Sequence, residues 1–328
     1  MKKSSDNLDS NYRPIIVLFL FISLIFLIFL FIFAINNIFV EEILLAPPQD
    51  LTDCGPLDQA DTVYTLQNDV TNTGTCFTIT ANDVTIEGQG HSVNYGTGSA
   101  GSKYGVFVDG VNNSIIRNLD IVEVNVDGTS KHGIYLIGAH NGLVEGNTIT
   151  GINHTSNGIF LYSGSSFNII RNNMLNVRAN GIYLNINAES NIIDDNNVVT
   201  LDTDTTRAIY LNTNSDFNNI INNNVTTYNV NGRGIQIQLS SHNIIDNNFV
   251  FTFGDSASGM RVESSATNNT FSNDIVKTFG SNSYAFVISS SDHSFVLRDS
   301  VLQTLGSAED FRVSSGVNGG QWNFTNVS

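Results

Sequence analysis

Gly133-Ile134-Tyr135-Leu136 recurs along the chain as Gly158-Ile159-Phe160-Leu161, Gly181-Ile182-Tyr183-Leu184 and Ala208-Ile209-Tyr210-Leu211. Weaker copies begin at Gly105, Gly234, Gly259 and Ala285, and successive copies start 23 to 28 residues apart. Self-similarity at a nearly fixed period of this size is typical of an architecture in which structural repeats stack on one another. The sequence therefore predicts a stacked repeat domain.

Each copy is followed by a polar turn and a second phrase, seen best as Asn168-Ile169-Ile170-Arg171-Asn172-Asn173. A third apolar piece, such as Phe249–Phe253, and a loop of variable length complete the repeat. No segment of the repeats offers ten residues of helical periodicity, whereas alternation over four residues is frequent. Three short strands and three turns per repeat predict one coil of a parallel β-helix, whose strands pair with those of the neighbouring coils.

The two phrases, Gly-Ile-x-Leu and Asn-x-Ile-x-x-Asn, resemble the right-handed parallel β-helix repeats of the pectin-lyase-like superfamily. The resemblance is strongest to the repeat subset in exported surface proteins of prokaryotes, archaea included, and covers about residues 62–328. It implies an all-β, single-stranded right-handed helix of about ten rungs, roughly 43 Å long at about 4.8 Å per rung. These markers are specific for architecture and almost silent on activity.

Asparagines recur at matching places in consecutive coils and predict a ladder of stacked amides at a corner. Such amides hydrogen-bond from rung to rung, and asparagine tolerates the left-handed conformation that a sharp corner needs. Asp274 and Asp299 are expected to continue the column, and a sugar- or metal-binding role is the competing interpretation. The predicted ladder residues are Asn147, Asn173, Asn196, Asn224 and Asn248.

The N-terminal part predicts a membrane anchor. Ile15 to Ala34 is apolar except for Ser23, and twenty residues in a helix span roughly 30 Å, the thickness of a bilayer core. Lysines precede this run and acidic residues follow it, so we expect a single pass with the N-terminus inside and the bulk of the chain extracytoplasmic. A cleaved signal peptide is the alternative. The predicted divisions are a cytoplasmic 1–13, a signal anchor at 14–36, a proline-containing linker and start of a cap at 37–61, and the β-helix at 62–328.

Charge and cysteine content limit the choice of partners and compartment. The formal net charge of −16 repels phosphate backbones, so nucleic acid is not expected as a partner. Cys54 and Cys76 are the two cysteines, and in an exported chain they predict a disulfide that staples an N-terminal cap over residues 50–75 to the first coil.

The residue between Ile and Leu of the repeated phrase carries the main functional hypothesis. The two aliphatics share one face, so the residue between them points outward if they fill the core. The outward residues are aromatic in five consecutive coils, and a row of rings beside polar residues could bind a glycan. Two alternatives stay open, namely a ladder of rings that only stabilises the strands and a surface covered by a partner protein. The predicted glycan stripe consists of Phe107, Tyr135, Phe160, Tyr183 and Tyr210.

The catalytic case is weaker, and we lean against an enzyme. Enzymes of the resembled superfamily use clustered carboxylates for Ca²⁺ or paired aspartates for hydrolysis. Asp202 and Asp204 are the best Ca²⁺ candidates, no other cofactor is implied, and the adjacent Asp194-Asp195 is expected to be a solvated corner. His132 and His154 are expected to be surface histidines. Candidate glycosylation sites are Asn112, Asn153 and Asn268.

These observations predict a membrane-anchored surface β-helix that binds or displays carbohydrate without catalysis. The alternatives are a polysaccharide lyase or glycoside hydrolase and a structural spacer of the cell envelope.

Overall fold

The computed structural model describes residues 48–98, 101–126, 128, 130–201, 205–289, 294–314 and 321–328. Residues 46–328 form one compact unit. The predicted signal anchor at 14–36 lies outside the described residues. Within the described residues, no helix has the length and apolar character needed to cross a bilayer.

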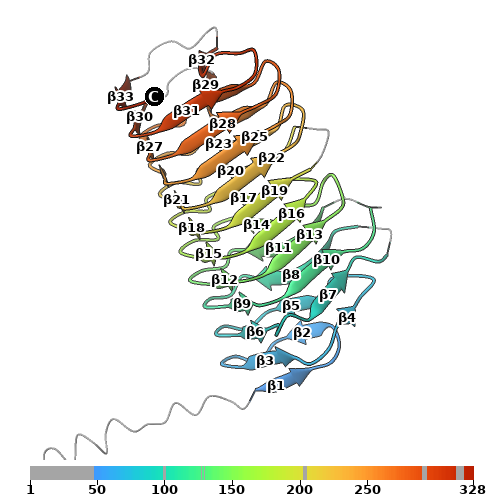
Figure 1. Cartoon of the computed structure of the whole chain (residues 1–328). Coiled ribbons are helices and arrows are strands. Elements are labelled where there is room, and N and C mark those ends of the chain that lie inside the picture. Colours follow the sequence, from blue (N-terminus) through green and yellow to red (C-terminus); the bar gives the residue numbers. More distant parts are fainter. Residues whose placement is uncertain are drawn as a thin grey trace, which may run out of the picture. The chain divides into compact units, whose positions relative to one another are not determined.

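Three parallel sheets form the faces of one stack of coils, as the sequence predicts (Figure 1). Sheet A contains β1 (Gln49–Leu51), β3 (Val63–Leu66), β6 (Thr85–Glu87), β9 (Ile115–Arg117), β12 (Leu143–Glu145), β15 (Ile169–Arg171), β18 (Ile192–Asp194), β21 (Asn219–Ile221), β24 (Ile244–Asp246), β27 (Asn269–Ser272), β30 (Ser294–Arg298) and β33 (Gln321–Thr325). Sheet B contains β2 (Gly55–Leu57), β5 (Phe77–Ile79), β8 (Lys103–Asp109), β11 (Lys131–Ile137), β14 (Ile159–Tyr162), β17 (Ile182–Asn185), β20 (Arg207–Asn212), β23 (Arg233–Gln238), β26 (Ser258–Glu263), β29 (Tyr284–Ser289) and β32 (Phe311–Val313). Sheet C contains β4 (Val70–Thr71), β7 (Ser92–Tyr95), β10 (Asp120–Glu123), β13 (Thr148–Gly151), β16 (Met174–Val177), β19 (Asn197–Thr200), β22 (Asn224–Thr227), β25 (Phe249–Thr252), β28 (Ile275–Thr278) and β31 (Val301–Thr304).

The aliphatic residues of the repeated phrase fill the interior of the stack. Ile134 and Leu136 are buried, whereas Tyr135 between them is only half-buried on the outside of sheet B. The glycine that opens the phrase allows close packing near the start of the sheet B strands, where the chain turns in from sheet C. A Cβ on Gly181 would lie 2.2 Å from Val198 Cγ1 and 2.5 Å from the carbonyl oxygen of Ala208. The phrase therefore encodes core filling and close packing together.

Sheet pairing begins at Gln49, inside the stretch predicted as linker and start of the cap. β1 pairs with β3 and β2 pairs with β5, so these residues already belong to the stack. Pro56 fits in β2 because this strand is at the edge of sheet B, where a missing N–H breaks no ladder. Cys54 and Cys76 form the predicted disulfide, which links this first coil to the start of β5.

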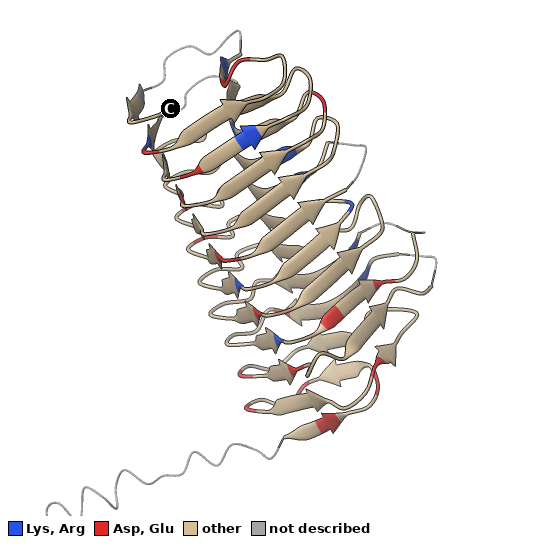
Figure 2. Ribbon diagram, viewed as in Figure 1, with Lys and Arg blue, Asp and Glu red and all other residues tan. Residues whose placement is uncertain are grey.

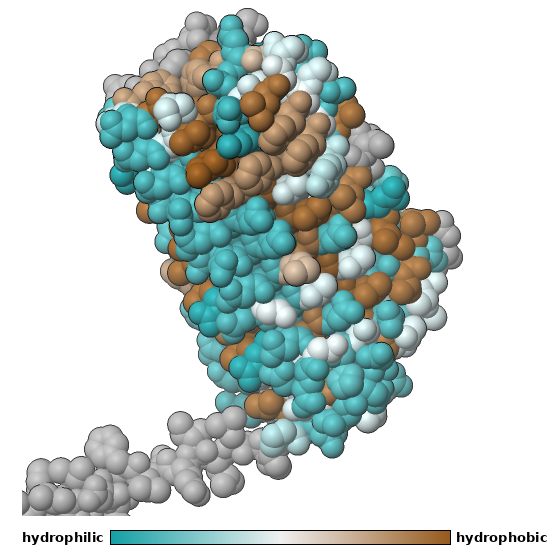
Figure 3. Space-filling view, viewed as in Figure 1, coloured by the Kyte–Doolittle hydropathy of each residue, from teal (hydrophilic) through white to brown (hydrophobic). Residues whose placement is uncertain are grey.

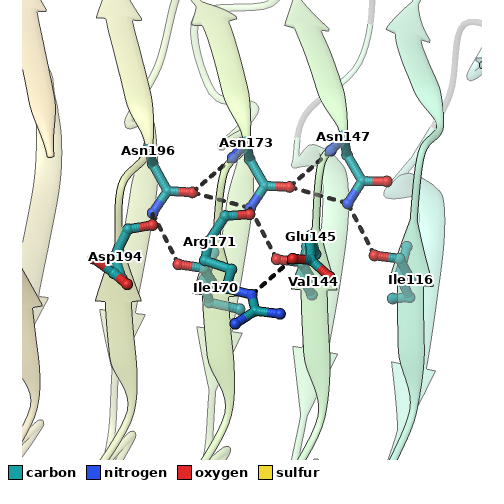
Figure 4. A network of polar contacts seen from close by, with 9 residues as sticks. All are labelled: Ile116, Val144, Glu145, Asn147, Ile170, Arg171, Asn173, Asp194 and Asn196. Carbon is teal, nitrogen blue, oxygen red and sulfur yellow. Dashed lines mark hydrogen bonds and ion pairs between the residues drawn. The ribbon is translucent and has the colours of Figure 1, made fainter. Parts of the chain in front are cut away.

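A ladder of buried asparagines lines the corner between sheets A and C (Figure 4). The amide oxygen of Asn173 accepts from the main-chain N–H and the side-chain nitrogen of Asn147, each at 3.0 Å. Asn196 serves Asn173 in the same way, and each amide nitrogen also donates to a main-chain carbonyl, such as that of Ile170. The ladder thus satisfies polar groups that the corner would otherwise bury without partners.

The predicted ladder was wrong by one residue in one coil. Asn223, not Asn224, accepts from Asn196 and donates to Asn248, while Asn224 opens β22 with an exposed side chain. Three consecutive asparagines in this coil allowed the alignment to slip. Asn222 takes the left-handed conformation with a φ of 58°, so adjacent residues divide the two tasks that sequence reasoning gave to one.

The end of the ladder also differs from prediction. Asp274 continues the column, accepting from Asn248 at 2.9 and 3.0 Å. Asp299 does not, because it takes the left-handed position with a φ of 51° and the hydroxyl of Ser300 accepts from the N–H of Asp274.

A second ladder, which the sequence analysis did not predict, runs along the other end of the sheet A strands. One buried asparagine stands two residues before the inward-facing residue of each of these strands. From the second member on, its amide oxygen accepts from the ladder asparagine one coil earlier, at 2.8 to 3.2 Å. Sheet A is therefore flanked by amide ladders at both ends of its strands. The members are Asn168, Asn191, Asn218, Asn243 and Asn269.

We predict that Asn223→Ala lowers the free energy of unfolding by about 2–4 kcal/mol, because it leaves several buried donors and acceptors without partners. The matched control Asn224→Ala changes an exposed side chain and should stay within about 0.5 kcal/mol of the parent chain. Chemical denaturation of the two variants measures the difference. Equal losses would contradict the register of the ladder.

A second prediction concerns Asp274, the carboxyl group in the ladder. Burial raises its pKa to about 8, and its Oδ2 has no hydrogen-bond partner, so the neutral acid is the favoured folded form. Because the folded pKa lies above the unfolded one, stability falls as the pH rises from about 4 to 8. Asp274→Asn removes this dependence, so its thermal-stability advantage over the parent should grow across that window, by at most about 1.4 kcal/mol per pH unit. An advantage that is the same at pH 4.5 and pH 8 would contradict this assignment.

Candidate functional site

The outer face of sheet B carries the predicted stripe in strict register. Strand pairing aligns Phe107 with Tyr135, then Phe160, Tyr183 and Tyr210 on successive rungs. The column continues with polar or aliphatic residues on the later rungs. These are Gln236, Arg261, Val287 and Arg312.

The five rings stack on one another. Centroid separations fall along the stripe from 5.4 Å between Phe107 and Tyr135 to 4.7 Å between Tyr183 and Tyr210, and interplanar angles fall from 18° to 6°. Rings stacked this way cover each other's faces, so the first four, which are half-buried, present mainly their edges, whereas Tyr210 is buried with 7% exposed. A sugar on this surface therefore contacts ring edges and phenol groups rather than ring faces.

Additional rings widen the stripe at its N-terminal end. Tyr104 packs against Phe107 and Tyr135 with centroids 5.1 and 4.9 Å apart, and Tyr162 lies 5.4 Å from Phe160. His132 lies edge-on to Phe160 at 5.0 Å. The aromatic surface is therefore two columns wide on these rungs.

His132 was wrongly expected to be a surface histidine. Only 6% of it is exposed, and its Nδ1 accepts from the main-chain N–H of Asn157 at 3.0 Å. Burial lowers its pKa to about 4, so the ring is neutral near pH 7. Its ring contacts Tyr135 and Phe160 from three residues before the stripe, a spacing that strict strand alternation would place on the opposite face, so the sequence carried no signal for it. His154 is exposed, as expected.

A buried lysine braces the loops beside this end of the stripe. Lys131 is fully buried, and its Nζ donates to the carbonyl oxygens of Gly96 at 3.1 Å and Asn125 at 3.0 Å. Buried Glu123 accepts from Asn153 and Ser156 nearby, and burial raises the pKa of its carboxyl group. The loops between sheets C and B are thus tied together by buried charges.

The stripe ends at Tyr210 in a polar network. The hydroxyl of Tyr210 donates to Gln238 Oε1 at 2.5 Å, and the guanidinium of Arg207 lies 4.7 Å from its ring centroid. Asn212 Nδ2 donates to the hydroxyl of Tyr183 at 3.3 Å. Desolvation raises the pKa of Tyr210 to about 12, and that of Tyr135 likewise, so both phenols are protonated near neutral pH.

Beyond Tyr210, two arginines pair with one carboxylate, and a third is linked to it through Gln236. Gln236 Oε1 accepts from Arg207 at 2.8 Å and Arg233 at 2.6 Å, and its amide nitrogen donates to Glu263 at 2.8 Å. Glu263 also pairs with Arg261 and, at 3.6 Å, with Arg233. Desolvation, followed by the charge of Arg261, lowers the pKa of Arg233 to about 10. We call these residues the arginine cluster; sequence analysis missed it because its members come from three coils and three columns.

The other predicted residues do not converge on this face. The weak Ca²⁺ candidates Asp202 and Asp204 lie outside the described residues, and the described residues contain no group of three or more potential metal ligands. Asp195 is a left-handed corner residue with a φ of 52°, and Asp194 beside it accepts from Asn222 at 2.8 Å.

The candidate glycosylation sites differ in accessibility. Asn153 is 4% exposed, and its Nδ2 donates to the carbonyl oxygens of Val126 at 2.6 Å and Gly128 at 2.9 Å. Attaching a sugar to this nitrogen would break contacts that order the loop. Asn112 is half-buried and Asn268 is exposed, so these two remain accessible candidates.

Comparisons with known proteins agree on the architecture. A family model described as the right-handed β-helix region matches residues 67–250. No curated protein sequence matches the chain. The solved structures named below share 10% to 14% sequence identity with it, so the likeness concerns the fold alone.

Three of these structures illustrate the range. A double mutant of the periplasmic alginate epimerase AlgG has a TM-score of 0.59 at 14% identity, with 83% of this chain and 77% of that chain covered. The A-module of the Azotobacter vinelandii mannuronan C-5 epimerase AlgE6 has a TM-score of 0.53 at 13% identity, covering 86% and 91%. A hyperthermoactive exopolygalacturonase from Thermotoga maritima has a TM-score of 0.54 at 10% identity, covering 84% of each chain.

The arginine cluster generates a stability prediction. Glu263→Gln leaves the guanidinium groups of Arg233 and Arg261 without their shared carboxylate, so we expect a loss of about 1–2 kcal/mol at low salt that shrinks at about 0.5 M salt, where repulsion is screened. Glu145→Gln is the control, because the pair of Glu145 with Arg171 is more exposed than that of Glu263 and should contribute less than about 1 kcal/mol. Thermal melts at both salt concentrations measure the effect. A salt-independent loss would rule out guanidinium repulsion as its cause.

Proposed function

The chain belongs to the right-handed β-helix family, and on that premise we propose that it is a non-catalytic carbohydrate-binding protein of the cell surface. The proposed binding surface is the outer face of sheet B, from Phe107 to Glu263. The proposed setting is extracytoplasmic, with a single-pass N-terminal anchor and the N-terminus inside.

The observation that carries this proposal is the in-register row of rings beside a column of polar side chains. The accessible part of the row runs over four rungs from Phe107 to Tyr183, about 14 Å, which is long enough for two to three sugar units, and buried Tyr210 closes it. Two residues beyond the ring column, Asn185, Asn212 and Gln238 present amides on the same face. Hydroxyl-rich ligands need such donors and acceptors next to apolar surface.

The stacking geometry specifies the mode of contact. A glycan lying along the stripe would place its C–H groups against ring edges and its hydroxyls against Tyr135, Tyr183 and the amide column. Both tyrosines are protonated near neutral pH, because burial raises their pKa values, and they can donate hydrogen bonds to sugar oxygens. The rings are already held by their neighbours, so little side-chain entropy is lost on binding.

The lean away from catalysis rests on the state of the ionisable groups on this face. Hydrolysis of a glycosidic bond uses a pair of carboxyl groups with separate roles. Glu263 is occupied by Arg261, Gln236 and the hydroxyl of Ser289. Tyr210, with its pKa raised to about 12, is a poor general base near neutral pH.

Two further observations support the setting and the ligand class. Disulfides persist mainly outside the cytoplasm, which favours export of a chain that carries Cys54–Cys76. The similar structures include proteins named for alginate epimerisation and for polygalacturonase activity, so this scaffold accommodates sugar polymers in other chains.

The test is a glycan array probed with the full chain, read for retention and for cleavage, with and without Ca²⁺. We expect retention without cleavage. In a second arm, Tyr135→Phe with Tyr183→Phe keeps the ring stack but removes two hydroxyls, and should weaken retention at least fivefold. Tyr228→Phe is the matched control. Tyr228 directly follows β22 of sheet C and is exposed, so removing its hydroxyl should leave binding like that of the parent.

The remaining outcomes discriminate the alternatives. Cleavage of any glycan would identify a lyase or hydrolase and overturn the non-catalytic proposal. Neither retention nor cleavage across the array would favour a structural spacer. Unchanged retention by the double variant would move the binding surface away from the stripe.

A further inference from the structure

A second exposed surface lies on sheet C, in the half of the stack that ends at the C-terminus. Large apolar side chains lie at the first position of consecutive strands or directly after their last residue, and they are 37% to 54% exposed. Figure 3 shows brown and tan atoms gathered over this part of the sheet, which faces the viewer in Figure 1. We call this surface the sheet C patch. It consists of Tyr228, Phe249, Phe253, Phe279, Val301 and Leu305.

Strand register makes the patch continuous rather than scattered. Phe249 pairs through Ile275 with Val301, and the residues after β22, β25, β28 and β31 form a second column. In that column Tyr228, Phe253 and Phe279 stack with centroids 5.1 and 4.6 Å apart. Two columns of apolar side chains therefore cross three or four rungs, on either side of the column that holds Phe251 and Lys277.

The exposed apolar area is large for a free surface. Six side chains of about 150–250 Å² each, about half exposed, contribute on the order of 500 Å². Monomeric proteins rarely leave a contiguous patch larger than a few hundred Å² without a use, and a standard interface buries about 800 Å² per partner. The fold does not require these residues, because the earlier strands of sheet C present mostly polar residues at the position of Phe249, such as Thr148, Asn197 and Asn224.

The charged residues on and beside the patch indicate which kind of partner binds there. Lys277 is the one charged residue among the six outward positions of β25, β28 and β31, and this part of the sheet is otherwise tan in Figure 2. Asp255 lies just past Phe253, at the edge of the patch, and accepts from the N–H and the hydroxyl of Ser281 at 2.8 and 2.6 Å. These bonds lower the pKa of Asp255, which keeps its carboxylate ionised near pH 7.

We propose that the sheet C patch binds the same patch of a second copy of this chain, in a side-by-side dimer whose two-fold axis runs along the Phe253–Phe279 column, parallel to the stack. That axis exchanges positions two residues before the column with positions two residues after it, on the same rung. Lys277 then lies opposite Ser281 of the other copy, one rung from the Asp255 that Ser281 binds. The patch is thus complementary to itself in charge as well as in rung spacing.

This arrangement has a physical advantage over other occupants. A rigid sheet with a repeat of about 4.8 Å is matched by another sheet with the same repeat, and stacked sheets pack about 10 Å apart. A lipid surface would leave Lys277 and Asp255 without specific partners. The inference does not depend on carbohydrate binding, because sheet B is a separate face of the stack.

The test measures the oligomeric state of the purified full chain by size-exclusion chromatography with light scattering. We expect a dimer that becomes monomeric in the triple variant Phe253→Ser, Phe279→Ser, Leu305→Ser. The matched control Phe167→Ser, Met174→Ser, Phe217→Ser also removes three exposed apolar side chains, from earlier coils, and should stay dimeric. Thermal melts verify that each variant is folded.

The charge pair supplies an arm that does not depend on the triple variant. Lys277→Asp or Asp255→Lys alone should raise the dimer dissociation constant at least tenfold, and the two together should restore it. A parent chain that is monomeric at 100 µM would overturn the proposal, as would a dimer that survives the triple variant. Failure of the double exchange to restore dimerisation would overturn the proposed axis, and binding of the parent, but not the triple variant, to phosphatidylcholine vesicles would show a lipid surface instead.

Discussion

The stack depends on the hydrogen bond that each buried asparagine accepts from the coil before it. Every turn of a β-helix takes main-chain groups through a corner where no sheet partner is available, and the corner between sheets A and C is closed to water. One amide oxygen there satisfies a main-chain N–H and a side-chain donor of the neighbouring coil, and its nitrogen satisfies carbonyls. Without that arrangement each coil would bury several unpaired polar groups, at about 1–3 kcal/mol each.

The architecture could be predicted from the sequence because every coil needs the same kinds of residue at the same positions. Ile134 and Leu136 recur with glycine before them in coil after coil, so the strand, its inward face and its period could all be read from one chain. The register failed where three asparagines, Asn222 to Asn224, offered no internal marker. Only the pairing of Ile220 with Ile193 distinguishes the left-handed residue from the ladder residue beside it.

The candidate site could be predicted only where its residues occupy the same position in successive repeats. The aromatic stripe follows from the position between Ile and Leu, whereas the arginine cluster joins Arg207 and Arg233 of one column to Glu263 of another, over three coils. Its assembly depends on how long side chains lean across rungs, which periodicity does not encode. His132 was misjudged for a related reason, since its burial comes from the neighbouring rings and a loop rather than from its own strand.

The hydrogen bonds of the ladder all run in one direction along the stack, and this makes one coil the unit by which the stack can be lengthened or shortened. Each asparagine accepts from the coil before it and relies on the coil after it for an acceptor, so a coil is chemically complete only between two others. Insertion or loss of a whole coil conserves every kind of contact in the interior, whereas a change of half a coil shifts inward residues outward. Such a chain is therefore expected to gain or lose length in whole coils of about 25 residues. The outward residues are not constrained by the interior, so they can differ from one coil to the next.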